Sequence, residues 1–244
     1  EARGPDSVTS DGHGRHKIMS DSTLALAEAT PFVSLHAQLV ESDNVAVALS
    51  YTGFALGCCI AISGPRTPAL PAGSDWEDIA LLLFWSVLAV FLLAVAAVIN
   101  DRIIMHAVAG RRALLSHNAA MGVIEGASMV ASGILLRASL SGYDETVDIP
   151  MGEQLASMFL YWALGQVTFV VGALALQRIT PFDDQKEAHK GNLAAGIKFA
   201  GNQIATAFVV SNPLLKSEAL LTFCSYAVLA IILMALLRWL ATKV

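Results

Sequence analysis

Six long apolar runs occupy most of the chain after residue 44 and carry almost no charge. They cover residues 45–63, 79–99, 119–136, 155–176, 193–210 and 219–237. A helix needs roughly 20 residues to cross the hydrocarbon core of a bilayer, which matches the length of these runs. Lipid offers no hydrogen-bond partner to backbone groups, so the runs are expected to be helical. The sequence therefore predicts an all-α, polytopic membrane protein with six transmembrane helices.

The composition and the absence of catalytic motifs narrow the class further. The chain is 55% hydrophobic and 14% charged, with a mean hydropathy of +0.61, well above that of a soluble domain. No P-loop, GxSxG or HExxH motif occurs, and the three cysteines lack metal-ligand spacing. The sequence thus indicates a protein that is not an enzyme, with no cofactor, no metal and no nucleic acid, and with the lipid bilayer as its partner.

Three segments are expected along the chain. Residues 1–23 are polar, lack the apolar core of a secretion signal and read as an unstructured tail, with Met19 as an alternative natural start. Residues 24–43 are expected to form an amphipathic helix lying in the membrane interface. Residues 44–240 form the membrane domain. The apolar stripe of the interfacial helix consists of Phe32, Leu35, His36, Leu39 and Val40.

The distribution of basic residues predicts the orientation. With a cytoplasmic N-terminus, eleven Lys and Arg residues fall on the inner side: Arg3, Arg15, Lys17, Arg102, Arg111, Arg112, Arg178, Lys186, Lys190, Arg238 and Lys243. Three fall outside: Arg66, Arg137 and Lys216. Basic residues in short loops mark the cytoplasmic side, so both termini are expected to face the cytoplasm.

An internal repeat organises the runs. Asn44, Asn118 and Asn192 lie 74 residues apart, each at the start of an odd-numbered run and followed by small residues. Two crossings separate the copies, so the repeats are parallel. Each asparagine is expected to cap its helix. We expect three inner Asn-led helices around a pseudo-threefold axis, covered by three apolar helices. Close helix packing is expected at Gly53, Gly57, Gly122, Gly126 and Gly201.

The Asn-x-Ala-x-Ala/Gly pattern at Asn44, Asn118 and Asn192, with its following small residues, resembles the DUF350 family of YjfL-like bacterial membrane proteins. The resemblance covers roughly residues 43–213. The first copy departs from the family pattern because a full apolar span does not precede Asn44. The resemblance implies an inner-membrane protein of unassigned activity, encoded near envelope-stress genes.

Two charged residues lie inside the predicted spans, Glu125 and Lys198. Helical rise places them about 10 Å and 9 Å into the membrane. A charge there usually faces the protein interior, a partner or water. One interpretation is a structural ion pair between them, or Lys198 reaching back to the interface. The other is a site for an ion or charged solute, on a pathway that includes Thr52, Ser128, Asn202 and Gln203.

Two functions therefore compete. The polar inner helices and buried charges favour a channel or transporter for a small ion or polar solute, acting as a homo-oligomer or pseudo-trimer. The small-residue packing serves equally well in a non-transporting membrane scaffold or an envelope-stress-associated partner protein. The sequence names no substrate.

Overall fold

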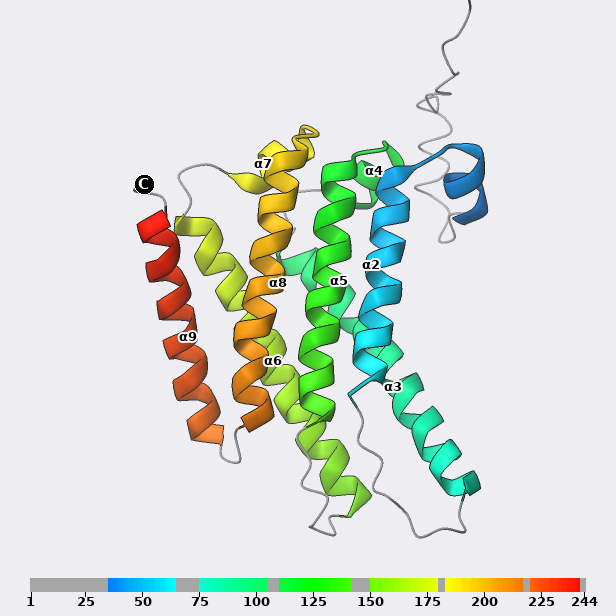
Figure 1. Ribbon diagram of the computed structural model, residues 1–244, viewed down its shortest axis with the longest axis vertical. Coiled ribbons are helices and arrows are strands. Elements are labelled where there is room, and N and C mark those ends of the chain that lie inside the picture. The colour runs from blue at the N-terminus through cyan, green and yellow to red at the C-terminus, as the bar shows by residue number, and fades with distance from the viewer. Residues whose placement is uncertain are drawn as a thin grey trace, which may run out of the picture.

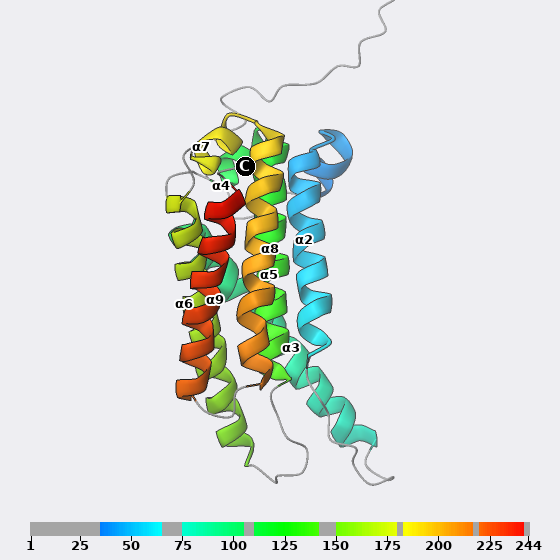
Figure 2. The same ribbon diagram turned by 60° about the vertical axis from the view of Figure 1, so that its left-hand side comes forward.

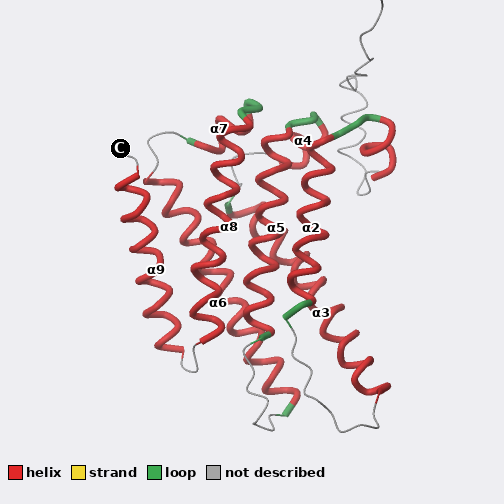
Figure 3. The backbone as a smooth tube through the Cα atoms, viewed as in Figure 1, coloured by secondary structure: helices red, strands yellow, loops and turns green. Residues whose placement is uncertain are grey.

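The structure is a computed structural model that describes residues 35–64, 75–104, 110–141, 150–179, 183–216 and 220–241. These residues form helices and short connections, and no strand occurs among them (Figure 3). The all-α class is confirmed. The described helices are η1 (Ala37–Glu41), α2 (Val45–Ile62), α3 (Asp75–Ile103), α4 (Gly110–Leu115), α5 (Ala119–Leu140), α6 (Met151–Ile179), α7 (Asp184–His189), α8 (Leu193–Lys216) and α9 (Leu220–Ala241).

The three Asn-led helices α2, α5 and α8 stand side by side as a row, which we call the central row (Figure 1). α5 packs along its whole length between α2 and α8, whereas α2 and α8 share no extended contact. As a result, 72% of the α5 span is buried but only 22% of the α2 span. The expected pseudo-threefold arrangement is wrong. A small-residue pattern predicts close helix contact but leaves open whether three helices close into a ring or line up.

Glycines at the row's contacts bring the helix backbones together. A Cβ atom at Gly122 would lie 2.7 Å from Cα of Ala46, and one at Gly196 would lie 3.0 Å from Cα of Ala120. A Cβ at Gly133 would lie 2.8 Å from Cα of Gly57. No side chain fits in these gaps. The other predicted packing glycines Gly53 and Gly126 also face each other across α2 and α5, but Gly201 has open space around it.

The apolar helices α3, α6 and α9 form a covering layer that runs antiparallel to the row (Figures 1 and 2). α3 packs on α2 and α5, α6 packs on α5 and α8, and α9 packs on α8 and α6. Buried side chains such as Leu93, Phe169 and Phe223 fill the space between the layers. The outer surfaces of these helices expose large apolar residues, including Phe91 and Val167, as expected for a lipid-facing layer.

The start of each row helix has the same local geometry. The residues before the asparagines, Asp43, His117 and Gly191, have φ angles of 50°, 63° and 92°. Their left-handed backbone turns the chain from a short helix (η1, α4 or α7) into the row helix. The side chains of Asn44 and Asn118 then accept hydrogen bonds from N–H groups of the first turn, and Asn192 accepts from the Ala195 N–H at 3.2 Å.

Five helices are long and apolar enough to cross a membrane: Val45–Ile62, Ile79–Ile103, Ala119–Leu140, Met151–Arg178 and Leu193–Leu215. The sixth predicted span falls on α9, where the apolar stretch found among the described residues is Thr222–Leu233. Six spans therefore remain a prediction. Of the expected interfacial helix, residues 24–34 lie outside the described residues, and Ala37–Glu41 forms a short π-helical turn.

The tail expected over residues 1–23 also lies outside the described residues. Pro213 lies inside α8, which continues to Lys216.

The close contact between α2 and α5 can be tested by filling it. We expect Gly122→Leu to lower the stability by about 1–3 kcal/mol, because the added side chain must push the two backbones apart. Thermal unfolding in detergent micelles measures the change. Gly152→Leu is the matched control, since nothing lies within 4 Å of its Cβ position. Equal melting temperatures for both variants would contradict the close packing.

Candidate functional site

Lys198 forms its ion pair with Asp184, not with Glu125. The Lys198 Nζ donates to Asp184 Oδ1 at 3.0 Å, across from α8 to the first residue of α7. The Asp184 side chain is 2% exposed and that of Lys198 is 39% exposed. An ion pair between Glu125 and Lys198 was one of the interpretations open from the sequence, and Lys198 instead pairs with Asp184. The short helix α7 packs on α8 and buries Asp184.

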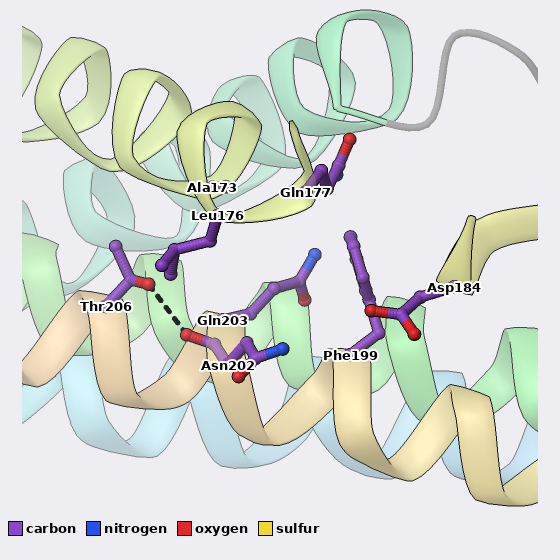
Figure 4. Close-up of a pocket in the computed structure, with 8 residues that line it drawn as sticks. All are labelled: Ala173, Leu176, Gln177, Asp184, Phe199, Asn202, Gln203 and Thr206. Carbon is purple, nitrogen blue, oxygen red and sulfur yellow. Dashed lines mark hydrogen bonds between the residues drawn. The ribbon is translucent and has the colours of Figure 1, made fainter. Parts of the chain in front are cut away.

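Asp184 also lines a small pocket enclosed by α6, α7 and α8, which we call the amide pocket (Figure 4). Its volume is about 10 Å³, just enough for one water molecule. Its lining residues are Ala173, Leu176, Gln177, Asp184, Phe199, Asn202, Gln203 and Thr206. The structure thus brings the predicted residues Asn202 and Gln203 together with a carboxylate.

The central residue of the amide pocket is Gln203. It is 2% exposed, and neither atom of its amide has a hydrogen-bond partner among the described residues. Its amide points into the space between α6 and α8 (Figure 4). Leaving a buried amide unpaired costs roughly 1–3 kcal/mol, so such a group calls for an explanation such as a bound water or ion.

An open groove lies beside the amide pocket, at the end of the row where α7 packs on α8. Lys198 lines this groove and also holds Asp184 of the amide pocket, so it stands between the two spaces. The other lining residues of the groove are Asp183, Lys186, Glu187, Lys190, Asn192, Ala194 and Ala195.

Asp183 directly precedes α7, at the edge of this groove. Burial raises the pKa of Asp183. Hydrogen bonds from Lys186 and Gln185, together with the nearby Lys186 charge, lower the pKa by more than burial raises it. The net pKa lies below that of an ordinary aspartate. Asp183 is thus charged near neutral pH and caps the start of α7.

The remaining predicted pathway residues lie elsewhere. Glu125 is half-buried on α5, near the Ser50 side chain of α2. Thr52 is exposed on the outer side of α2. Ser128 is buried in a separate polar cluster with Asn100. These residues do not form one continuous pathway with the amide pocket.

That separate cluster, the Asn100 cluster, links α3, α5 and α6 between the two layers. The Asn100 amide donates to the hydroxyls of Ser128 at 3.1 Å and Ser132 at 2.8 Å, and its oxygen accepts from Gln166. One hydrogen bond is missing in this cluster, because the Gln166 Oε1 atom is buried and has no hydrogen-bond partner among the described residues. Neither Asn100 nor Gln166 was predicted as a site residue from the sequence. In the sequence, the feature that marks these two residues is a single amide side chain within or directly after an apolar run.

Among the described residues, no three His, Cys, Asp or Glu side chains gather as metal ligands. The amide pocket instead offers the neutral oxygen atoms of amides and a hydroxyl beside one carboxylate. Such oxygens suit water or a hard, weakly bound cation better than a transition metal.

Comparison with known proteins supplies the family. The profile of the family described as "Domain of Unknown Function (DUF350)" matches residues 22–140 and 150–244, most of the chain. The chain belongs to the DUF350 family. This DUF350 protein is also 23% identical, over 160 residues, to a "UPF0719 transmembrane protein" of Aquifex aeolicus (strain VF5). That match covers 66% of this chain and 55% of the relative, so the chain spans about half the relative's length.

No solved structure matches this DUF350 protein. The relative's description and the five apolar helices agree that the chain is a membrane protein. The descriptions of the family and of the relative name no activity. The amide pocket is therefore the feature from which a function can be inferred.

The Lys198–Asp184 pair generates a stability prediction. Lys198→Met leaves a buried carboxylate without its cation, so we expect a loss of about 1–3 kcal/mol or more. The double variant Lys198→Met/Asp184→Asn removes both charges and is expected to recover much of that loss. Unfolding in detergent measures all three variants, including Asp184→Asn alone. Strictly additive losses would show that the two side chains are not coupled.

Proposed function

We propose that this protein moves a small ion or polar solute across the membrane and binds it in the amide pocket. The observation that carries this proposal is the Gln203 amide, which is buried without a partner beside the Asp184–Lys198 pair. If this position served packing alone, an apolar side chain would be expected there, since it leaves no buried polar group without a hydrogen bond. A solute that binds and leaves explains why the amide persists.

The size and chemistry of the pocket favour a small cation. A volume of about 10 Å³ admits one water molecule or a dehydrated monovalent ion. Four of its lining residues, Asp184, Asn202, Gln203 and Thr206, carry side-chain oxygen atoms, and hard cations prefer oxygen ligands. A larger solute would require α6 and α8 to move apart.

Lys198 would then act as a competitor for the cation. Its ammonium group holds the Asp184 carboxylate, so an arriving cation must share or displace that ion pair. The Lys198 side chain is partly exposed to the groove, so the displaced ammonium group can move into the groove. This arrangement makes Lys198 a gate between groove and pocket.

We propose that the groove opens to the cytoplasm of a bacterial cell and that both termini lie there, in the inner membrane. The short helices at this end carry Arg111, Arg112, Lys186 and Lys190, and basic residues near span ends favour the cytoplasmic side. The pathway would thus be loaded or emptied from the cytoplasm through the groove.

A second candidate, a membrane scaffold without transport, is favoured by the groove itself. The groove has a volume of about 550 Å³ and presents both acidic and basic side chains. A polar segment of a partner protein would fit it without any solute entering the amide pocket.

Ion flux separates the two candidates. Proteoliposomes containing the wild-type chain are expected to dissipate an imposed gradient of Na⁺, K⁺ or protons faster than empty vesicles. Gln203→Leu is expected to slow this flux at least tenfold, because it removes the amide oxygen from the pocket. Thr222→Val, an exposed change on α9 outside the pocket, serves as the control and should leave the flux unchanged. Wild-type flux no faster than empty vesicles would sink the proposal and favour the scaffold.

A further inference from the structure

The two contacts within the central row are the same contact used twice. Gly122 on α5 lies against Ala46 on α2, and Gly196 on α8 lies against Ala120 on α5. Both pairs are 76 residues apart (122 − 46 and 196 − 120). Each row helix therefore has two faces. One face receives the preceding helix, and the other packs on the following helix.

Hydrogen bonds repeat with the helix contacts. The Asn44 amide donates to the Leu114 carbonyl at 2.9 Å, and the Asn118 amide donates to the Ala188 carbonyl at 3.0 Å. Both bonds join residues 70 apart. Each asparagine thus links its own helix to the short helix that precedes the next row helix. This link and the glycine contact together define one step along the row.

The face that would make a third step is exposed on α8. Adding two repeat lengths, 148 residues, to the contact residues Ala46, Gly53 and Gly57 of α2 gives Ala194, Gly201 and Ala205. All three are exposed. Gly201 has no atom within 4 Å of its Cβ position. Among the described residues, no carbonyl accepts from the Asn192 amide, although Asn192 caps α8 as the other asparagines cap their helices.

The face that would receive such a step is open on α2. Subtracting 74 from Gly122, Gly126 and Gly133 of α5 gives Ala48, Thr52 and Cys59, which are partly or fully exposed. The position equivalent to the Leu114 carbonyl is that of Val40 in η1, at 114 − 74. Both halves of the contact are thus available on one molecule, at opposite ends of the row.

We propose that the α8 face of one copy packs on the α2 face of a second copy, continuing the central row from chain to chain. In this contact Ala194, Gly201 and Ala205 lie against Ala48, Thr52 and Cys59 of the second copy. Asn192 donates to the Val40 carbonyl of the second copy. The occupant is a second copy because the same chain carries both complementary faces, and both continue an interface already used twice.

The proposed contact is looser than the one between α2 and α5. Side chains stand at Ala48, Thr52 and Cys59 where α5 has glycines, so the helices cannot approach as closely. Gly201 opposite Thr52 leaves room for the threonine. Because the two faces differ, the association is head-to-tail. Such contacts build a closed ring or an open chain of copies rather than a two-fold dimer.

Disulfide formation tests this register. Gly57 lies against Gly133, and the same step places Ala205 against Cys59 of the second copy (57 + 148 and 133 − 74). In a background with Cys58→Ala and Cys224→Ser, Ala205→Cys is expected to cross-link to the native Cys59 in membranes under mild oxidation. Each copy carries one cross-linking cysteine on its α2 face and one on its α8 face. The gel should therefore show trimers and higher species as well as dimers.

A mixing experiment fixes the direction. Two differently tagged variants are made in the same background. One carries Ala205→Cys and Cys59→Ser, and the other keeps Cys59 as its single cysteine. The two variants should cross-link to each other when mixed, and neither should cross-link when it is present alone. The control is Val167→Cys with Cys59 retained, an exposed position (60%) in the covering layer, and it should give at least tenfold less product. Cross-linking of the Ala205→Cys copy with itself, or equal yield from the Val167→Cys control, would overturn the head-to-tail contact.

A packing variant provides an independent readout. Gly201→Leu fills open space in the single chain, so its melting temperature should match that of the wild type. It is expected to reduce the Ala205–Cys59 cross-link at least tenfold, since leucine would collide with Thr52 of the second copy. An unchanged cross-link yield would contradict the proposed contact.

Discussion

The fold depends on the close approach of helix backbones along the central row. At Gly122, Gly133 and Gly196, the neighbouring helix lies so near that no side chain fits between them. In a membrane the hydrophobic effect does not drive helices together, so van der Waals contact between backbones supplies much of the association. These contacts hold α5 between α2 and α8, and the covering layer then packs on the resulting surface.

Much of this architecture could be predicted from the sequence. Apolar runs follow directly from membrane thickness, and five of them correspond to helices long enough to span. The helix starts at Asn44 and Asn118 lie where the sequence placed them, because an asparagine before a small-residue run is a local signal. The linear row could not be predicted. A glycine in such a run indicates a close approach but does not identify which helix approaches, and Gly201 has no atom within 4 Å of its Cβ position.

The candidate site was harder to predict because its partners come from different parts of the sequence. Lys198 stands out in the sequence as a charge inside an apolar run, but its partner Asp184 lies outside the runs, among several other charged residues. Asn100 and Gln166 form a buried cluster although each is a single amide in or beside an apolar run. Hydropathy averages hide such residues. Only the packing of α6 and α7 onto the row shows which amides lie in water and which are enclosed.

The parallel direction of the three row helices has an electrostatic consequence. Each helix carries about half a positive elementary charge at its N-terminus, and none of the three has an acidic residue in its first turn. Three like partial charges therefore stand side by side and repel each other. The antiparallel covering helices bring their negative ends to the same side, so attraction acts between the layers while repulsion acts within the row. Every helix added to the row must overcome this repulsion, and a chain with longer rows would depend still more on its glycine contacts.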